Sequence, residues 1–266
     1  AVASLVYAAL GACLAFSWTQ IVVAMGGAPG GQWSIHATTQ ALKYLPGNVA
    51  HLAGRHALAT RSGLSQKLLL TAAPVEAALL VCAAGLTCLM AGPFILPLAE
   101  RALPPVQWLL AGLGVSGLLA GGGTLLLFRN RKRLSDLIPA TGPRRTALLR
   151  AFAGHLVFFA GCGLVGLVLL HSLTGAWISG AGPVRLTAAL ALAWLAGFLV
   201  PGAPAGLGVR ETVILALVAP MHGAAVATGL AALYRIATFC GDTVIALAGL
   251  TGTLTIGSPK NKELTP

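Results

Sequence analysis

Charged residues are scarce in this sequence, and acidic residues are the scarcest. Only 9% of the 266 residues are Asp, Glu, Lys or Arg, and only six are acidic, whereas roughly a quarter of the residues in ordinary soluble domains are charged. So few charges could not cover the surface of a soluble fold. Because 57% of the residues are hydrophobic, most of the surface must face lipid, and the sequence predicts an integral membrane protein.

The sequence also lacks the motifs of soluble enzymes and of nucleotide-driven transporters. It has no P-loop, no GxSxG nucleophile elbow and no HExxH pair. Its histidines and cysteines show no metal-ligand or disulfide spacing. We therefore expect no metal, no cofactor and no enzymatic activity. The net charge of +11 does not require a nucleic-acid partner, because the basic residues gather in loops between apolar runs.

Long apolar runs recur along almost the whole chain. They approach or exceed the ~20 residues that a helix needs to cross a ~30 Å hydrocarbon core. They are continuous rather than alternating, which excludes the pattern of a transmembrane β-barrel. We predict an all-α fold, a polytopic transmembrane helix bundle that forms a single domain over residues 1–256, with a solvated tail at 257–266. The spans expected in the first two thirds are 2–23, 68–96, 106–127 and 151–173. Pro74 is expected to break the second of these near its start.

The first apolar run follows neither an initiator Met nor a basic stretch. A cleaved signal peptide would carry such a basic region. We therefore interpret residues 2–23 as a span and expect the chain to be truncated at its start.

Basic residues are concentrated in two segments, 26–67 and 129–150. The first has four basic residues and no acid, and the second has seven basic residues and one acid. Cytoplasmic loops of membrane proteins carry an excess of Lys and Arg. Both segments are therefore predicted to be loops on the cytoplasmic side.

The last third of the chain lacks clean spans. The apolar run at 186–200 is short and meets PGAPAGLG at 201–208, whose prolines and glycines oppose a continuous helix. The next run, 209–218, is also too short to cross, and Pro220 and Gly223 follow it. We predict broken or re-entrant helices around a polar interior, because non-helical backbone is tolerated at membrane depth only where protein or water satisfies it.

Two segments of the sequence resemble each other, KYLPGNVAHLAGR at 43–55 and FLVPGAPAGLGVRE at 198–211. Each has a Pro-Gly pair, then small residues, a Gly and an Arg, with the same spacing from Pro to Arg. Paired Gly/Pro interruptions in corresponding halves of a transporter indicate internal repeats around a central site. An inverted repeat is one interpretation, and two ordinary membrane-interface turns are the other.

Ionisable residues within apolar runs are costly and are functional hypotheses by default. Glu211 is the first candidate. In a functional role it would pair with a cationic lipid headgroup or with Arg235. In a structural role it would belong to a static ion pair or be a carboxylate at a helix N-terminus. Arg55, Arg210 and Arg235 present planar guanidinium groups that suit phosphate. Lys43 adds a point charge, and anchoring at the headgroup level is the alternative for Lys43 and Arg55.

Three further ionisable residues are considered, of which Asp242 and His51 are included in the predicted site. Asp242 lies seven residues after Arg235, so a continuous helix would place both on one face. Glu76 lies either in the interior or near the headgroups, and His51 is the one histidine inside the first motif. The predicted lipid-binding residues are Lys43, Tyr44, Pro46, Gly47, His51, Arg55, Pro201, Gly202, Gly208, Arg210, Glu211, Arg235 and Asp242.

The two motifs, together with LYRI at 233–236, resemble the lysylphosphatidylglycerol synthase transmembrane-region family. The resemblance covers most of the chain and implies a multi-pass protein of the bacterial inner membrane that translocates lipids, with phospholipids or other polar lipids as partners. No counterpart of the soluble aminoacyl-transferase domain is present, so we expect no lysyl transfer by this chain.

Two other functions remain open at this stage. One is a non-transporting membrane module that supports a separate glycosyltransferase or lipid-modifying enzyme. The other is an integral-membrane transferase that acts on a lipid carrier, which the scarcity of acids available as general bases disfavours.

Overall fold

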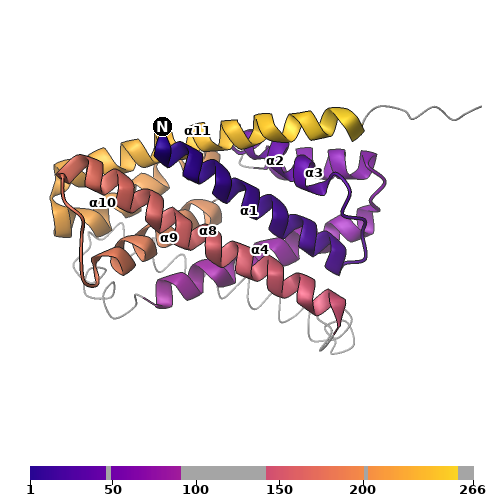
Figure 1. The fold of residues 1–266 in the computed structure, drawn as a ribbon, viewed down its shortest axis with the longest axis horizontal. Helices are drawn as coiled ribbons and strands as arrows, with labels where there is room; N and C mark the ends of the chain where they lie inside the picture. Colours follow the sequence, from indigo (N-terminus) through magenta and orange to yellow (C-terminus); the bar gives the residue numbers. More distant parts are fainter. Residues whose placement is uncertain (46–48, 91–141, 201–202, 257–266) are drawn as a thin grey trace, which may run out of the picture.

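The computed structural model describes residues 1–45, 49–90, 142–200 and 203–256 (Figure 1). Within these ranges the chain forms eight α-helices and two short 3₁₀-helices, which confirms the predicted all-α class. The elements are α1 (Val2–Ala24), α2 (Gln32–Thr39), η1 (Gln40–Tyr44), α3 (Ala50–Arg61), α4 (Gln66–Leu89), α8 (Pro143–Thr174), α9 (Gly182–Leu199), η2 (Pro204–Gly206), α10 (Val209–His222) and α11 (Ala224–Ile256).

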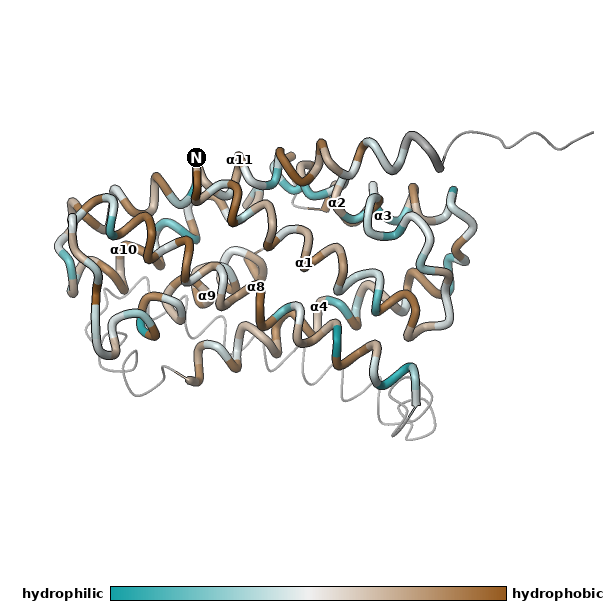
Figure 2. Tube along the Cα trace, viewed as in Figure 1, coloured by the Kyte–Doolittle hydropathy of each residue, from teal (hydrophilic) through white to brown (hydrophobic). Residues whose placement is uncertain are grey.

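Six helical segments of the described chain are long and apolar enough to cross a membrane. Large apolar side chains such as Leu70 and Leu89 are exposed on the outside of the bundle. Figure 2 shows hydrophobic residues along the long helices, with more hydrophilic positions on α2 and α3. Lipid is the solvent that such a surface requires, so the protein is a multi-pass membrane protein. The six segments are Val2–Ala24, Gln66–Leu89, Pro143–Thr174, Gly182–Leu199, Pro204–His222 and Ala224–Thr253.

Helices α1 and α8 pack along each other and run in opposite directions (Figure 1). Helix α11 lies against α1 and α2 through glycines that bring backbones together. A Cβ at Gly241 would lie 2.8 Å from the Ser4 carbonyl oxygen, and one at Gly249 would lie 2.6 Å from the Thr38 nitrogen. Small residues at such interfaces allow close van der Waals packing, which drives helix association in lipid.

Two expected interruptions do not interrupt their helices. Helix α4 continues through Pro74, and α10 continues through Pro220 to His222. Single prolines are tolerated in membrane helices because neighbouring groups satisfy the freed carbonyl. The prediction that the run after residue 208 is too short to cross is therefore wrong, since η2 and α10 together reach spanning length. Helix α9 also reaches spanning length, because it begins at Gly182 rather than near residue 186.

The predicted break between these helices is confirmed. Helix α9 ends at Leu199 and α10 begins at Val209, with the short η2 between them. Ala205 has a φ of 47°, and Gly206 and Gly208 have φ values of 73° and 82°, a left-handed region in which glycine is favoured. Because η2 packs beside η1, the break lies next to the 3₁₀-helix that contains the start of the first motif.

The basic segment 26–67 was expected to be a loop, and this prediction is wrong. The segment folds into α2, η1 and α3, and α2 packs between α1 and α11. Arg55 is only 5% exposed, so it does not anchor the chain at the headgroup level. Its buried acidic partner, described below, is what holds it inside. The end of the second basic segment is likewise helical, because α8 begins at Pro143.

Several sequence predictions lie outside the described residues. They are the span at 106–127, the end of the 68–96 span, most of the basic segment 129–150 and the tail at 257–266.

Candidate functional site

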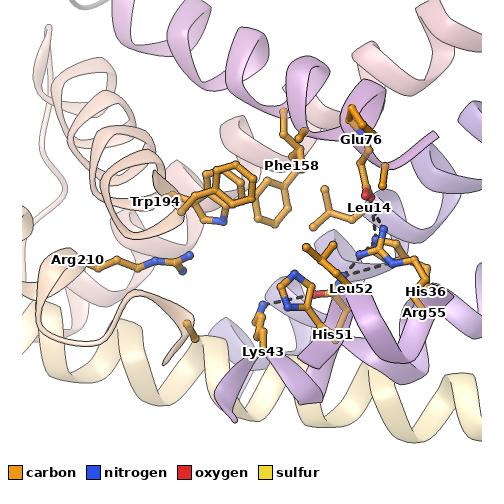
Figure 3. A pocket seen from close by; sticks show the side chains of 17 residues that line it. Leu14, His36, Lys43, His51, Leu52, Arg55, Glu76, Phe158, Trp194 and Arg210 are labelled. Carbon is orange, nitrogen blue, oxygen red and sulfur yellow. Dashed lines mark hydrogen bonds and ion pairs between the residues drawn. The ribbon is translucent and has the colours of Figure 1, made fainter. Parts of the chain in front are cut away.

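A cavity of about 330 Å³ lies between the helices that carry the two motifs (Figure 3). One part of its wall is polar and basic, and the other part is aliphatic and aromatic. This combination suits a ligand with both an anionic group and an apolar body. The polar side chains are His36, Gln40, Lys43, His51, Arg55, Glu76 and Arg210, and the large apolar ones are Leu14, Leu52, Leu80, Phe158, Trp194 and Phe198.

Glu76 of α4 is the acid that lines this cavity. One of its carboxylate oxygens, Oε2, accepts a hydrogen bond from Arg55 Nη1, and the other, Oε1, lies 3.2 Å from His36 Nε2. The Arg55 guanidinium also lies 4.7 Å from the centre of the Trp18 ring. Ions inside a membrane protein pair in this way because isolated charge is expensive there. Arg55 is thus held by a carboxylate and an aromatic face.

Asp242 of α11 forms a second buried ion pair behind the cavity wall. Its Oδ2 lies 2.8 Å from Lys43 Nζ and accepts a hydrogen bond of 2.7 Å from the Tyr44 hydroxyl. Asp242 is 2% exposed. This pair ties η1 to the last helix.

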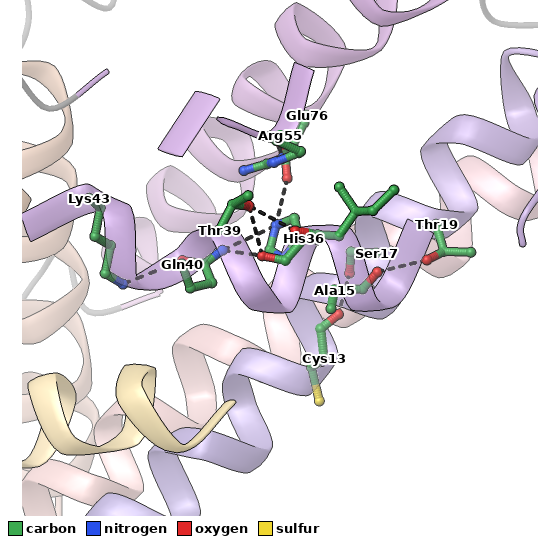
Figure 4. A network of polar contacts seen from close by, with 11 residues as sticks. Cys13, Ala15, Ser17, Thr19, His36, Thr39, Gln40, Lys43, Arg55 and Glu76 are labelled. Carbon is green, nitrogen blue, oxygen red and sulfur yellow. Dashed lines mark hydrogen bonds and ion pairs between the residues drawn. The ribbon is translucent and has the colours of Figure 1, made fainter. Parts of the chain in front are cut away.

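Gln40 joins the two ion pairs into one polar network (Figure 4). Its Nε2 lies 3.2 Å from both ring nitrogens of His36, and its Oε1 lies 3.5 Å from Lys43 Nζ. An ionised Glu76 only accepts hydrogen bonds, so His36 Nε2 carries the hydrogen and Nδ1 accepts from the Gln40 amide. A continuous series of polar groups therefore runs from Glu76 to Asp242.

The two cavity histidines outside the spanning helices are neutral near pH 7. Burial lowers the pKa of His36 to about 4 and that of His51 to about 4, and the Arg55 guanidinium adds to the effect in both cases. Among the described residues, the cavity wall therefore carries three cations, Lys43, Arg55 and Arg210, against one lining carboxylate.

Arg210 of α10 reaches the cavity through a glycine cradle. A Cβ at Gly197 would lie 2.6 Å from Arg210 Nε, and one at Gly206 would lie 2.7 Å from the same atom. The guanidinium lies 5.7 Å from the Trp194 ring centre. Among the described residues, Arg210 has no acidic partner and its buried Nε has no hydrogen-bond partner. Within the described part of the chain, Arg210 is thus a cation presented to the cavity without a counter-ion.

Glu211 has a local structural role and does not line the main cavity. Its Oε2 accepts a 2.7 Å hydrogen bond from the Gly208 nitrogen at the start of α10, and its Oε1 lies 3.7 Å from Arg235 Nε. Arg235 also donates to the carbonyl oxygens of Ala205 at 2.9 Å and Pro204 at 3.3 Å. The expectation that Arg235 needs an acidic partner is confirmed, and the pair braces η2.

The candidate residues therefore fall into separate groups. Lys43, His51, Arg55 and Arg210 meet at the cavity. Tyr44 and Asp242 lie behind Lys43, and Arg235 lines a separate shallow hollow with Tyr44. Four candidate residues lie outside the described chain, Pro46, Gly47, Pro201 and Gly202.

The sequence did not predict His36, Gln40 or the aromatic wall as parts of the site. It left two locations open for Glu76, the interior and the headgroup level. Glu76 had a usable signal, because an acid within an apolar run must find a partner. Trp194 and Phe198 also had one, since residues four apart share a helix face. His36 had none, because its segment resembled a loop.

Among the described residues, no group of three or more His, Cys, Asp or Glu side chains is arranged to hold a metal ion. The acids at the cavity are engaged by basic side chains instead.

No protein-family model, curated protein or solved structure matches this chain. The fold and the cavity define a class, a multi-pass membrane protein with six candidate spans among its described residues and a basic cavity between its helices. No family is identified.

Proposed function

We propose that this protein binds an anionic phospholipid by its headgroup in the basic cavity and carries that headgroup across the bacterial inner membrane. The observation that carries the proposal is the Arg210 guanidinium, which faces Lys43 and Arg55 across the cavity (Figure 3) and has no acidic partner among the described residues. A phosphate would supply the missing negative charge. The resemblance of the two motifs to the lysylphosphatidylglycerol synthase transmembrane-region family supports the same function.

The size and chemistry of the cavity support a headgroup rather than a whole lipid. A volume of about 330 Å³ is at the lower end of the range for small-ligand pockets. A guanidinium grips two phosphate oxygens at once, which a lysine cannot do. The ring of Trp194 and its neighbour Phe198 offer an apolar surface beside the charge. Phosphate and glycerol fit this description, while the acyl chains would remain in the bilayer.

The arrangement of helices supports an inverted repeat with the cavity at its centre. In chain order α1 to α4 would correspond to α8 to α11. Helix α1 packs on α11 as α8 packs on α4, and α2 packs on α11 as α9 packs on α4. The equivalent pair α1 and α8 are in contact and run antiparallel (Figure 1). Arg55 and Arg210 would be equivalent residues, and both line the cavity.

Such a repeat provides a mechanism for movement of a headgroup. In transporters built from inverted repeats, one half moves against the other around a fixed site near the bilayer midplane. Here the cavity would face each leaflet in turn. We propose that the two arginines hold the phosphate throughout this exchange.

The test is a leaflet-resolved assay with fluorescent phosphatidylglycerol in proteoliposomes. Arg210→Gln removes the charge and the fork, and we expect lipid binding and movement to fall about tenfold or more, since a hydrogen bond to a charged group contributes about 1.5–3 kcal/mol. Arg210→Lys should retain part of the activity. Arg61→Gln, an exposed site at the end of α3, is the matched control and should behave as wild type.

Two outcomes would contradict the proposal. One is wild-type movement in Arg210→Gln, and the other is a wild-type protein that neither binds nor moves the lipid. Binding without movement would instead favour the non-transporting membrane module.

A further inference from the structure

We propose that binding of the anionic headgroup is coupled to uptake of one proton by His36, because the headgroup draws Arg55 away from Glu76 and the protonated imidazole replaces it. This inference rests on the function proposed above and adds a coupling to that function. It makes His36 and Gln40 positioning residues that connect ligand binding to the protonation state of the protein.

The first step of the argument is competition for Arg55. Arg55 lines the cavity and is also the guanidinium partner of Glu76. A phosphate that enters the cavity offers Arg55 a second anion of equal or higher charge. If Arg55 turns toward the phosphate, Glu76 keeps only a neutral imidazole as partner. A buried carboxylate without a counter-ion is strongly unfavourable, so a replacement cation is required.

The second step is the position of His36. Its Nε2 already lies 3.2 Å from Glu76 Oε1, and the residue is 1% exposed. One proton from the aqueous phase that binds Nδ1 would make an imidazolium next to the Glu76 carboxylate. No covalent bond between heavy atoms changes, and the proton returns to solvent when the ligand leaves and Arg55 rejoins Glu76.

The third step concerns Gln40. A protonated Nδ1 donates, so it can no longer accept from the Gln40 amide nitrogen. Gln40 must turn its amide so that Oε1 faces His36. That rotation withdraws Oε1 from Lys43 Nζ, which it now contacts at 3.5 Å. Lys43 then has one hydrogen bond fewer and can turn toward the phosphate, so proton uptake would strengthen the site.

The charges around His36 favour this direction. The groups that face it are Glu76 from α4, Arg55 and His51 from α3, and His155 from α8. Arg55 lowers the pKa of His36 and Glu76 raises it, after the larger lowering by burial. From α1 the Trp18 ring lies beside the imidazole, and from α11 Gly249 and Gly252 approach Thr38 and Ser34 of α2. When Arg55 turns away, the nearest cation no longer lowers the pKa of His36, while Glu76 still raises it.

One test needs no lipid. The purified full chain in detergent is labelled with ¹⁵N-histidine, and the His36 signals are followed against pH by NMR. In Arg55→Gln the titration midpoint of His36 should rise by about one pH unit or more, as expected when a neighbouring cation is removed. Arg55→Lys keeps the charge and should leave the midpoint near that of wild type. An unchanged midpoint in Arg55→Gln would overturn the proposal.

A second test measures the proton directly and remains decisive if Arg55→Gln fails to accumulate. Short-chain phosphatidylglycerol is titrated into the protein by calorimetry in two buffers of different ionisation enthalpy. Wild type should take up about one proton per lipid when the coupling is complete. His36→Gln should bind the lipid with uptake close to zero. Binding by wild type without proton uptake overturns the coupling and leaves the proposed function standing. Absence of binding refutes both.

Discussion

The two acids that are buried in the described part of the chain each contact two donor groups. Glu76 is held by Arg55 and His36, and Asp242 is held by Lys43 and Tyr44. Removal of one member of a buried ion pair typically costs 3–5 kcal/mol, because the other charge stays behind without a partner. These residues are therefore needed for folding as well as for any ligand, and variants that remove only one charge of a pair confuse the two roles.

Glu211 provides a clear separation between stability and function at the scale of one residue. Its carboxylate accepts from the first turn of α10 and pairs with Arg235, but it does not line the main cavity. Glu211→Gln keeps an acceptor for the Gly208 nitrogen but removes the charge, so we expect the free energy of unfolding to fall by about 0.3–1 kcal/mol through the lost ion pair with Arg235 and the lost charge at the helix N-terminus. Lipid movement per folded molecule should stay at the wild-type level. Thermal unfolding in detergent and the leaflet-resolved assay measure the two quantities.

The opposite result would restore Glu211 as a functional residue. A Glu211→Gln protein that unfolds at the wild-type temperature but no longer moves lipid could not be explained by the cap and the ion pair. Gln66→Ala, at the start of α4 and exposed, serves as a control for the handling of variants.

At this scale the sequence identified which charges are unusual but not which partners they have. Arg235 was expected to pair with Glu211 or Asp242, and the pair with Glu211 exists because both belong to neighbouring helices of the last third. The partner of Arg55 could not be foreseen in the same way. It depends on α3 folding back against α4, and the basic composition of that segment resembles an ordinary cytoplasmic loop.

At the scale of the element, the effect of proline depends on how many helix breakers lie together. Pro74 and Pro220 each stand alone within a helix that continues past them. The segment 201–208 has two prolines and three glycines, at about 3 kcal/mol for each interior proline and 1 for each glycine. Packing compensates the free-energy cost of one isolated proline in a helix. It does not compensate the summed cost of the prolines and glycines in 201–208. Local composition therefore predicted this break correctly and the other two wrongly.

Close packing of α11 on α1 depends on Gly241. A Cβ there would lie 2.8 Å from the Ser4 carbonyl oxygen and 3.0 Å from the Ala8 nitrogen, and backbone atoms cannot give way easily. We expect Gly241→Ala to destabilise the protein by about 1–3 kcal/mol, as overpacking does in other cores. Thermal unfolding in detergent provides the measurement.

Gly85→Ala is the matched control for this substitution. Gly85 lies within α4, and an added Cβ there meets no described atom within 4 Å. Its replacement should leave stability unchanged or raise it by up to about 1 kcal/mol through helix propensity. Equal effects of the two substitutions would show that the α11 interface has no steric requirement for glycine.

At the scale of the whole molecule, the first basic segment meets the described end of the second at one end of the bundle. Met25, Lys67 and Arg144 line the same surface hollow. Helix α8 then runs 32 residues, about 48 Å at 1.5 Å per residue, which is more than the ~30 Å core requires. The turn that follows α8 must therefore lie at the other face of the membrane.

Cysteine labelling in intact cells tests this topology. Lys67→Cys and Arg144→Cys should react only with reagents that reach the cytoplasm, because basic segments remain on that side. Ser179→Cys, in the turn between α8 and α9, should react from the periplasm. The five native cysteines are replaced beforehand. Labelling of Lys67→Cys and Arg144→Cys from opposite sides would contradict the structure, and periplasmic labelling of both would invert the assigned orientation.

Composition was enough to predict the class of the whole molecule. A chain with so few charges and such long apolar runs has no stable alternative to a helix bundle in lipid. The cavity itself could not be predicted from the sequence, because its wall is assembled from helices far apart in the chain. Four residues of that wall, Lys43, His51, Arg55 and Arg210, were predicted from the motifs to belong to one site.

The order in which the polar network can form has a consequence for how the protein is made. Arg55 and Glu76 are separated by only 21 residues, so they can meet as soon as α4 leaves the ribosome. Tyr44 and Asp242 are separated by 198 residues, so Lys43 and Tyr44 remain without their carboxylate until the last helix is synthesised. One side of the cavity is thus completed early and the other only at the end of translation. A chain that stops before α11 would expose an unpaired lysine at its interior, which gives cellular quality control a distinct mark of an unfinished molecule.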